Sequence, residues 1–428
     1  MRSLVAVLLA ALLGPAVARA DWGAPVALSP AGGDAYAAGV AAAGDRPAAL
    51  IATRRGGARG WSLDLRTSEA RGRFRAPAAV AASRNAFESA GLFTGPDGDL
   101  VAGWLEIVNG SRRPVVSTGP RLADRQVLAP GPRSTQVLRL AADRRGDAIA
   151  AFWRYDGRGY AIFAAYRPAG GRFGPPQLLA TGFPGDPAVA IDEGGVAVVA
   201  WTDRDGAHVA ERAAGADAFA PPVSIKSPSR PTSDAGVGVD GRVVVSWVVG
   251  AISDPRTVLV AERPSAGEGF GAPVALSAPG VRVPHWITPV VSLGYARALV
   301  AWVEGVLHTT TRDRAALAVS WAGGPWAAPV VRGVRAPAHV YVVDLLASDP
   351  TRPPILAMTT SQRFRLAALT ATVRPDGTLA PTRPVPAGGP VGFRPWLAPG
   401  AGHAWLATER TSGPASRPRH QVLLFRSR

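Results

Sequence analysis

The segment 190–225 contains one complete structural repeat, and this repeat constrains the fold more than any other feature of the chain. Four short apolar runs follow one another there, separated by turn signals at 193–195, 204–206 and 215–217. This pattern predicts a four-stranded antiparallel meander of about 35 residues. A single sheet of this size cannot bury both of its faces, so copies of it must stack against one another.

A recurring signature marks the last strand of each repeat: an aromatic residue followed three positions later by proline. It begins at Trp22, Phe74, Phe173, Phe219, Phe270 and Trp326, with weaker copies at Leu122 and Leu379. These starts recur at intervals of about 50 residues, as in a repeat architecture. Proline is tolerated on an edge strand but not on a central one, which predicts that this segment is the outermost strand of each sheet.

A second signature is a turn glycine followed by a tryptophan at the end of an apolar run. The spacing is six residues in three copies and longer in two others: Gly98/Trp104, Gly195/Trp201, Gly241/Trp247, Gly146/Trp153 and Gly294/Trp302. The runs between these residues are continuously apolar, which is typical of strands covered on both faces. We therefore expect the tryptophans to be core residues.

The two ends of the chain predict how the ring of sheets closes. The first edge strand, 22–28, has no preceding strands to pair with, whereas 393–428 supply three apolar runs and no edge strand. Pairing these segments in one shared blade leaves no open sheet. We predict an all-β protein, a single β-propeller of eight four-stranded antiparallel blades, with seven blades as the alternative. The expected blades are 35–80, 84–128, 133–179, 183–225, 229–276, 280–332, 337–385 and 393–428 plus 22–28.

Residues 1–20 have the features of a secretory signal peptide, which leaves a propeller domain of 21–428. Arg2 precedes an apolar run at 4–13, and Ala18-Arg19-Ala20 forms a small-residue cleavage site. A run of about ten residues is too short to span a bilayer, and no later stretch is long enough, so we expect no integral membrane segment. We expect a secreted, periplasmic or other cell-envelope protein. The chain has no cysteine, which excludes disulfides, Cys-ligated metals and a cysteine nucleophile.

The charge of the chain is strongly basic, with a formal net charge of +16. Nearly all basic residues are arginine, and alanine, glycine and proline are abundant too, as in proteins from GC-rich genomes. Nucleic-acid-binding surfaces concentrate basic residues so that several phosphates are neutralised together. The arginines here are scattered along the turns, so we expect no nucleic-acid partner.

Two turn motifs resemble those of known propeller families. Asp143-Arg-Arg-Gly146 and Asp192-Glu-Gly-Gly195 are similar to the sialidase turn motif S-x-D-x-G-x-x-W, and Ala190-Ile-Asp192 with Trp201 is similar to the repeat of eight-bladed quinoproteins. The chain therefore resembles exported bacterial β-propellers of the sialidase-like type with BNR-like repeats, and eight-bladed quinoprotein-like propellers. The serine of the sialidase motif is missing and the spacings differ. The resemblance therefore implies the fold and transfers no active-site residue.

Ligands of propellers usually contact the loops from strand 4 to strand 1 and from strand 2 to strand 3. In this chain those loops carry aromatic, basic and acidic side chains: His285, Trp286, His339, Tyr341, Arg394, Trp396, Tyr36, Phe87 and Glu88. Aromatic rings stack on sugar faces while polar groups bind the hydroxyls, so this set predicts a ligand-binding surface. The alternative is that the aromatic residues plug the wide channel of the ring.

Four carboxylates are placed near the channel mouth, Glu88, Asp186, Asp234 and Glu304. A retaining glycosidase needs two carboxylates about 5 Å apart. A sialidase also needs three clustered arginines and a tyrosine paired with a glutamate, and spacing alone assigns no partner to the candidate tyrosines. These are Tyr36, Tyr155, Tyr160 and Tyr341.

From these observations we expect a monomeric, non-catalytic propeller that binds a glycan, a peptide or an envelope protein on its loop face. One alternative is a sialidase-like exo-glycosidase with degenerate motifs, and another is a cell-envelope assembly scaffold. We assign no catalytic residue, metal site or cofactor, because the six histidines do not have paired ligand spacings.

Overall fold

The computed structural model describes residues 22–427 with several short gaps. The gaps are 56–59, 70–72, 132, 156, 158, 252–255, 279–280, 282, 284–287, 295–296, 306–313, 322–323, 334–338, 347–352, 363–364, 375–376, 388–390, 392–394, 401–402 and 413–418. The predicted signal peptide, 1–20, lies outside the described residues.

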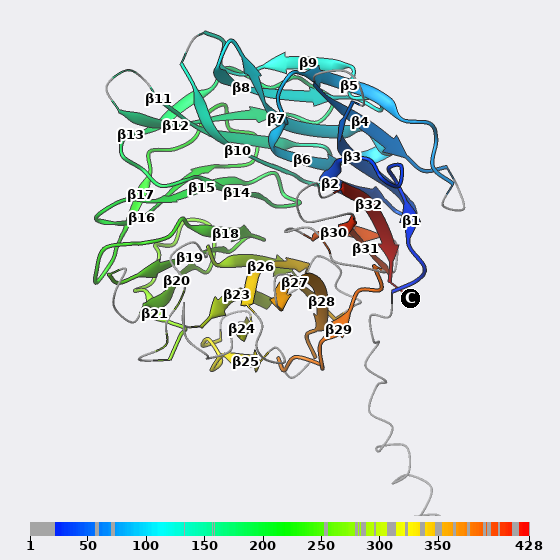
Figure 1. Ribbon diagram of the computed structural model, residues 1–428. Coiled ribbons are helices and arrows are strands. Elements are labelled where there is room, and N and C mark those ends of the chain that lie inside the picture. The colour runs from blue at the N-terminus through cyan, green and yellow to red at the C-terminus, as the bar shows by residue number, and fades with distance from the viewer. Residues whose placement is uncertain are drawn as a thin grey trace, which may run out of the picture.

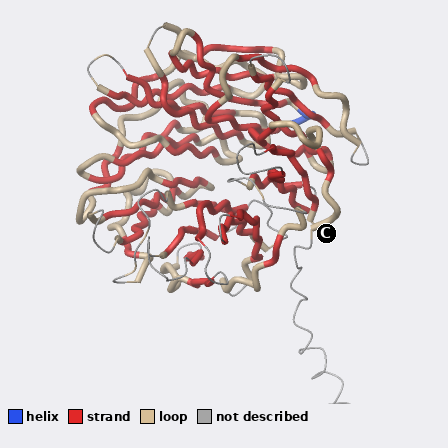
Figure 2. The backbone as a smooth tube through the Cα atoms, viewed as in Figure 1, coloured by secondary structure: helices blue, strands red, loops and turns tan. Residues whose placement is uncertain are grey.

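Eight four-stranded antiparallel sheets form the protein. Seven of them consist of four consecutive strands in meander order, and the eighth combines the last three strands with the first strand of the chain. They are arranged as the blades of a β-propeller (Figure 1), which confirms the predicted fold class and the choice of eight blades over seven. Strands make up almost all of the regular structure, and the helix in Figure 2 is the short 3-10 turn η2 (Pro96–Gly98).

The first four blades follow the chain in order. Blade 1 is β2 (Ala35–Ala43), β3 (Arg46–Arg54), β4 (Trp61–Thr67) and β5 (Ala78–Ser83). Blade 2 is β6 (Glu88–Thr94), β7 (Leu100–Val108), β8 (Ser111–Thr118) and β9 (Asp124–Val127). Blade 3 is β10 (Thr135–Ala142), β11 (Ala148–Tyr155), β12 (Tyr160–Arg167) and β13 (Gln177–Gly182). Blade 4 is β14 (Ala188–Ile191), β15 (Ala197–Thr202), β16 (Gly206–Arg212) and β17 (Val223–Lys226).

The other four blades complete the ring. Blade 5 is β18 (Gly236–Val239), β19 (Val243–Val249), β20 (Thr257–Arg263) and β21 (Val274–Ala275). Blade 6 is β22 (Val290–Gly294), β23 (Arg297–Glu304), β24 (Arg314–Trp321) and β25 (Val330–Gly333). Blade 7 is β26 (His339–Leu346), β27 (Ile355–Gln362), β28 (Arg365–Thr372) and β29 (Arg383–Pro384). Blade 8 is β30 (Trp396–Gly400), β31 (His403–Ser412), β32 (Arg419–Arg426) and β1 (Val26–Ala27).

The ring closes by pairing the two ends of the chain in blade 8, as predicted. Strand β1 lies antiparallel to β32 with Val26 opposite Leu424, and Figure 1 shows the two strands, blue and red, side by side. Trp22 is buried, and its indole Nε1 donates a hydrogen bond of 2.9 Å to the Thr370 hydroxyl of blade 7. This contact ties the N-terminal segment to the neighbouring blade as well as to blade 8.

The core lies between the blades and is built from the continuously apolar runs. Every residue of β19 is buried, and Trp104, Trp247 and Trp302 are fully buried. The prediction that the glycine-to-tryptophan signature marks core positions is therefore confirmed for these residues. Strands β13, β17 and β21 follow the proline-containing signature and lie at the outer edges of their sheets, as expected.

Several arginines have a structural role that composition did not reveal. Arg167, Arg212 and Arg263 are buried and each is the last residue of the third strand of its blade. The guanidinium of Arg167 lies 2.9 Å from Asp99 of blade 2, and that of Arg263 lies 2.6 Å from Glu211 of blade 4. Arginine at this position therefore links each of these two blades to the preceding one.

Within the described residues, no helix is long and apolar enough to cross a membrane.

Candidate functional site

A pocket with a volume of about 320 Å³ opens on the face where strand-4-to-1 and strand-2-to-3 loops emerge. Its lining comes mainly from the loops of blades 4 and 5 and includes Phe183, Thr202, Asp203, Arg230, Thr232 and Asp234. This is the loop face on which we expected a ligand. Blades 4 and 5 supply most of the lining, and it also includes Thr288, from the loop in which the predicted residues His285 and Trp286 lie.

The pocket rim is held in place by hydrogen bonds between the two loops and the strands below them. Gly185 N donates to the Thr202 carbonyl (2.7 Å), and the Thr202 hydroxyl donates to the Ser233 carbonyl (2.8 Å). A Cβ atom at Gly185 would lie 2.9 Å from Thr202 Oγ1 and 3.2 Å from Asp234 Oδ1, so the approach of the loops requires glycine here. A rim ordered in this way loses little entropy when a ligand binds.

Two aspartates are neighbours at the pocket, and three consecutive blades supply the group. Asp186 N of blade 4 donates to Asp234 Oδ1 of blade 5 (2.9 Å), and Arg139 Nη2 of blade 3 lies 3.5 Å from Asp186 Oδ2. Burial, followed by the negative charge of Asp234, raises the pKa of Asp186 to about 6, although Arg139 acts against the shift. Burial also raises the pKa of Asp234. Both carboxyls therefore stay protonated to a higher pH than an ordinary aspartate does.

The pKa of a third carboxylate, Asp203, is shifted in the opposite direction and is lowered. Burial alone would raise its pKa, but hydrogen bonds from His208 and from the backbone N–H groups of Asp205 and Gly206 lower it. His208 Nε2 lies 2.9 Å from Asp203 Oδ2, and its ring stacks on Trp201 with a centroid separation of 5.6 Å. The pocket is thus lined by Asp203, whose pKa is lowered, and by Asp234, whose pKa is raised, with Asp186 next to Asp234.

An aromatic row, defined here as Tyr155, Tyr160 and Phe183, leads from the pocket across blade 3. Phe183 is 81% exposed and Tyr155 is 43% exposed. The ring centroids of Tyr155 and Tyr160 are 5.4 Å apart, and those of Tyr160 and Phe183 are 6.4 Å apart. Tyr160 also stacks on Trp153 at 4.0 Å, which anchors the row to strand β11. Exposed aromatic rings next to a polar pocket are typical of small-ligand sites.

The sequence analysis missed Phe183 as a ligand-binding residue. It is the one aromatic residue of the strand-4-to-1 loop preceding blade 4 and lies between Gly182 and Pro184. This local pattern could have indicated an exposed aromatic ring, because a large apolar residue in a short surface turn cannot be buried in the core.

The structure gives packing roles to the predicted site residues of blades 1, 2 and 8 whose side chains it describes. Tyr36 donates its hydroxyl hydrogen to the Phe87 carbonyl, and Phe87 itself is only 3% exposed. Trp396 Nε1 donates to the carbonyl of Ala37 (3.1 Å), and Glu88 lies 2.7 Å from Arg112. Phe87 thus lies in the core, while Tyr36 and Trp396 form polar links between blades.

The side chains of the other five predicted site residues lie outside the described part of the structure. His285, Trp286 and Arg394 lie outside the described residues. His339 and Tyr341 lie on strand β26, and their side chains are likewise outside the described part. For these five positions a ligand-binding role stays a prediction.

Of the four carboxylates considered from the sequence, two are engaged in local contacts elsewhere. Glu304 is 2% exposed and accepts a hydrogen bond from Trp302 Nε1 (3.1 Å), and Glu88 pairs with Arg112. Asp186 and Asp234 come together as described above. Among the described residues, no group of three or more histidine, aspartate or glutamate side chains is arranged to hold a metal ion.

Tyr36 also lies near a partly buried glutamate, Glu409 of strand β31. Glu409 Oε1 accepts a hydrogen bond from Ala37 N (3.1 Å) at a bulge in β2. Burial and then the charge of Asp34 raise the pKa of Glu409 to about 7, because the hydrogen bond from Ala37 only partly offsets them. Burial raises the pKa of Tyr36 as well. The Tyr36 hydroxyl hydrogen is donated to the Phe87 carbonyl and not to Glu409, so Glu409 does not act on this tyrosine as a hydrogen-bonded general base in this arrangement.

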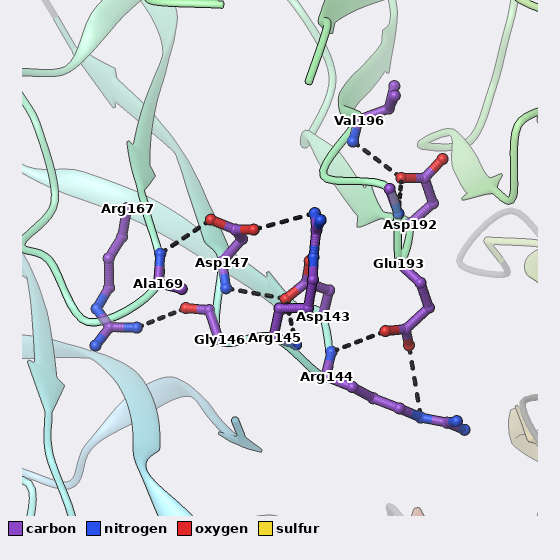
Figure 3. A network of polar contacts seen from close by, with 11 residues as sticks. Asp143, Arg144, Arg145, Gly146, Asp147, Arg167, Ala169, Asp192, Glu193 and Val196 are labelled. Atoms are coloured by element: carbon purple, nitrogen blue, oxygen red, sulfur yellow. Dashed lines mark hydrogen bonds and ion pairs between the residues drawn. The ribbon is translucent and has the colours of Figure 1, made fainter. Parts of the chain in front are cut away.

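The turn motifs that resemble those of sialidases lie at the opposite end of the strands from the pocket. Asp143 Oδ1 accepts hydrogen bonds from the backbone N–H groups of Arg145 and Asp147, each 2.9 Å long (Figure 3). Asp192 Oδ1 accepts in the same way from Gly194 and Val196, each at 2.9 Å. These aspartates stabilise the turns between first and second strands and do not line the pocket.

No protein-family model and no curated protein matches the chain. Among solved structures, the polysaccharide lyase Uly1 is similar with a TM-score of 0.49 and 9% identity, covering 92% of this chain and 90% of the lyase. An ulvan lyase has a TM-score of 0.47 and 11% identity, with 95% and 94% covered. A subtype N10 neuraminidase-like protein from a little yellow-shouldered bat isolate has a TM-score of 0.39 and 10% identity, with 69% and 94% covered.

The chain is therefore an eight-bladed β-propeller with lyases and neuraminidase-like proteins among its structural neighbours. All three TM-scores are below 0.5, so a function has to be argued from the residues of the site.

Proposed function

We propose that this protein is an exported carbohydrate-binding propeller whose pocket between blades 4 and 5 receives a sugar. The observation that supports the proposal is the 81% exposed ring of Phe183 at the wall of a pocket of about 320 Å³. The C–H face of a sugar stacks on an aromatic ring, while its hydroxyls need donors and acceptors around the rim. Thr232, Asp203 and Arg230 line the same pocket and offer such groups.

The Phe183→Ala variant tests this proposal. We expect it to weaken binding of a responsive oligosaccharide about tenfold, since an aromatic contact of this kind is worth about 1 kcal/mol or more. Its melting temperature should stay unchanged, because the removed ring is mostly exposed. Binding partners are found on a glycan array, and the affinity is then measured by titration calorimetry.

The matched control for this experiment is Leu178→Ala. Leu178 is 51% exposed and lies on the outer edge strand β13, away from the pocket. We expect this variant to bind as the parent protein does. Equal losses in the two variants, or an array without any bound glycan, would contradict carbohydrate binding at Phe183.

A second function, glycoside hydrolysis, is favoured by the contact between Asp186 and Asp234. A carboxyl with a pKa of about 6 is still partly protonated near neutral pH and suits a general acid, while a neighbouring carboxylate suits the second role that glycosidases need. We therefore propose a sialidase-like or other exo-glycosidase as the alternative, with Asp186 as the proton donor. Its activity should fall as the pH rises above about 6.

The Asp186→Asn variant separates the two functions on a panel of fluorogenic glycosides. If the protein is a hydrolase, we expect this variant to lose at least about 100-fold in kcat, the usual contribution of general acid catalysis. Asp124→Asn is the control, because Asp124 is half-exposed and pairs with Arg172 at the opposite end of the strands. If the parent protein binds a glycan but hydrolyses none of the glycosides, the hydrolase alternative is wrong and the non-catalytic function stands.

Export is part of the proposal and depends on residues 1–20, which have the features of a signal peptide. The expected result is that the protein purified from its native host begins near Asp21, as measured by N-terminal mass spectrometry. A chain that keeps residue 1 inside the cell would contradict it.

A further inference from the structure

We propose that Ser224, His208 and Asp203 of blade 4 form a catalytic triad that hydrolyses a carboxylic ester, with Ser224 as the nucleophile and His208 as the base. This activity goes beyond carbohydrate binding in the pocket and does not depend on it. The three residues are separated in the sequence and come from three places in one blade: the turn after β15, strand β16 and the outer strand β17.

The imidazole of His208 lies between the other two side chains. Its Nδ1 is 3.0 Å from Ser224 Oγ, and its Nε2 is 2.9 Å from Asp203 Oδ2. The strand register explains the first contact, because His208 of β16 lies directly opposite Ser224 of β17. Side chains of opposite residues in an antiparallel pair share one face of the sheet and lie close together. Nucleophile, base and carboxylate therefore follow one another in the order used by serine hydrolases.

The surroundings of each residue suit its role. Ser224 is exposed on the last strand of the blade, so a substrate can reach its hydroxyl. The side chain of His208 is 15% exposed and is held by its stacking on Trp201. Asp203 Oδ1 accepts hydrogen bonds from the backbone N–H groups of Asp205 (2.8 Å) and Gly206 (3.2 Å), which leaves Oδ2 toward His208. The base and the carboxylate are thus positioned before a substrate binds.

The triad lies on the face of blade 4 that is turned toward blade 3 and its aromatic row. Along β16, Ala210 packs with blade 3, whereas Ala207 and Val209 pack with blade 5. Because successive side chains of a strand alternate between its faces, His208 and the opposite Ser224 face blade 3. Trp153, on which Tyr160 stacks, packs against the same core cluster as Ala210. This arrangement favours an ester with an aromatic or other apolar group.

A backbone donor for the negatively charged oxygen of the transition state is present on Ser224 itself. Ser227 N donates to the Asp205 carbonyl (3.3 Å), so these two residues form a hydrogen-bonded pair of the ladder. Hydrogen-bonded and non-hydrogen-bonded pairs alternate along antiparallel strands, which makes His208 and Ser224 a non-hydrogen-bonded pair. The N–H of Ser224 therefore points to the free edge of the blade, where it can donate to the oxyanion.

The reaction consists of two acyl transfers. With the imidazole hydrogen on Nε2, toward Asp203, His208 Nδ1 accepts the hydroxyl hydrogen of Ser224 while Oγ bonds to the carbonyl carbon of the ester. The bond from this carbon to the alcohol oxygen then breaks, and the alcohol leaves with the hydrogen from Nδ1. Water next gives a proton to Nδ1 and attacks the acyl carbon; the carboxylic acid leaves, and Ser224 recovers its hydrogen. The Asp203 carboxylate stabilises the imidazolium in both steps.

The experiment measures hydrolysis of p-nitrophenyl acetate and p-nitrophenyl butyrate by the full chain, and covalent labelling by a fluorophosphonate. We expect turnover of at least one ester above the rate in buffer. We also expect the phosphonyl group on the tryptic peptide 213–226, in which Ser224 is the one residue with an aliphatic hydroxyl. Mass spectrometry of the digest locates the label.

Three variants test the three roles. Ser224→Ala should abolish both labelling and turnover, and His208→Gln should lower kcat at least about 100-fold. Asp203→Asn keeps an oxygen that accepts the hydrogen bonds from Asp205 and Gly206. We expect it to lower kcat at least about tenfold with KM unchanged, a split that a purely structural role would not produce.

Ser265→Ala is the matched control. Ser265 is also an exposed serine, but it lies in the turn between β20 and β21, at the opposite end of the strands. Turnover and labelling of this variant should equal those of the parent. Melting temperatures of all four variants show whether each is folded, and Ser224→Ala decides if His208→Gln is not, because it removes one exposed hydroxyl.

The possible outcomes are distinct. A parent protein that hydrolyses neither ester and takes up no label, or takes up the label on another peptide, would overturn the triad. The same holds if Ser224→Ala hydrolyses the esters as the parent does. Carbohydrate binding is measured separately through Phe183→Ala, so it stands or fails independently of these results.

Discussion

Replacing Trp247 with alanine is expected to lower the free energy of unfolding by about 3–5 kcal/mol, the usual cost of deleting a large aromatic side chain from a packed core. Trp247 is 0% exposed and lies at the centre of β19, where its indole Nε1 donates to the Ser227 hydroxyl (3.3 Å). The cavity left between blades 4 and 5 is surrounded by residues of both sheets, including Val198 and Val245. Urea denaturation of the two proteins at the same pH measures the difference.

Phe183→Ala serves as the control for this measurement. It also removes an aromatic ring, but one that is 81% exposed, so we expect a change within about 0.5 kcal/mol. A loss below about 1 kcal/mol in Trp247→Ala would show that the tryptophans of the glycine signature do not hold the blades together.

Replacing Glu409 with glutamine is expected to stabilise the protein at pH 8 by up to about 3 kcal/mol and to change little near pH 4. Folding raises the pKa of Glu409 from its ordinary 4.5 to about 7, chiefly through burial. The stability gained from the protonated form is therefore fully present below pH 4.5 and is lost as the pH rises to about 7. Glutamine stays neutral, and its carbonyl oxygen accepts the hydrogen bond from Ala37 N as the carboxyl does.

The measurement is the free energy of unfolding of parent and variant at pH 4.5, 6 and 8. Glu69→Gln is the matched control, because Glu69 is 54% exposed and pairs with the exposed Arg75. Its difference from the parent should not depend on pH. A Glu409→Gln variant that is less stable than the parent at pH 8 would show that the carboxylate is ionised and stabilising in the fold.

The architecture was predictable because the residues that define it recur with every blade. Proline after an aromatic residue marked the outer strands, and continuous apolar runs such as Val243–Val249 marked strands buried on both faces. Even the pairing of Val26 with Leu424 followed from sequence, since a first edge strand and a last three-stranded segment leave one arrangement in which no sheet stays open.

The candidate site was predicted less well, and the arginines show why. Base composition accounted for their number but not for their places. Arg167 is buried against Asp99 of blade 2, whereas Arg144 is exposed and pairs with Glu193 of blade 4. Nothing in the local sequence separates these cases, because the partners belong to other loops or other blades.

By itself the sequence determined the strands, their order in each sheet, the number of blades and the face on which a ligand is expected. These depend on burial and turn geometry, which each short segment carries in its own residues. Only the tertiary structure decided which loops form the pocket and which charges meet there. Asp186 contacts Asp234 through the packing of blade 4 against blade 5, and Phe183 reaches Tyr160 through the position of one loop over blade 3. Such contacts depend on how blades stack in space, which no repeat unit specifies alone.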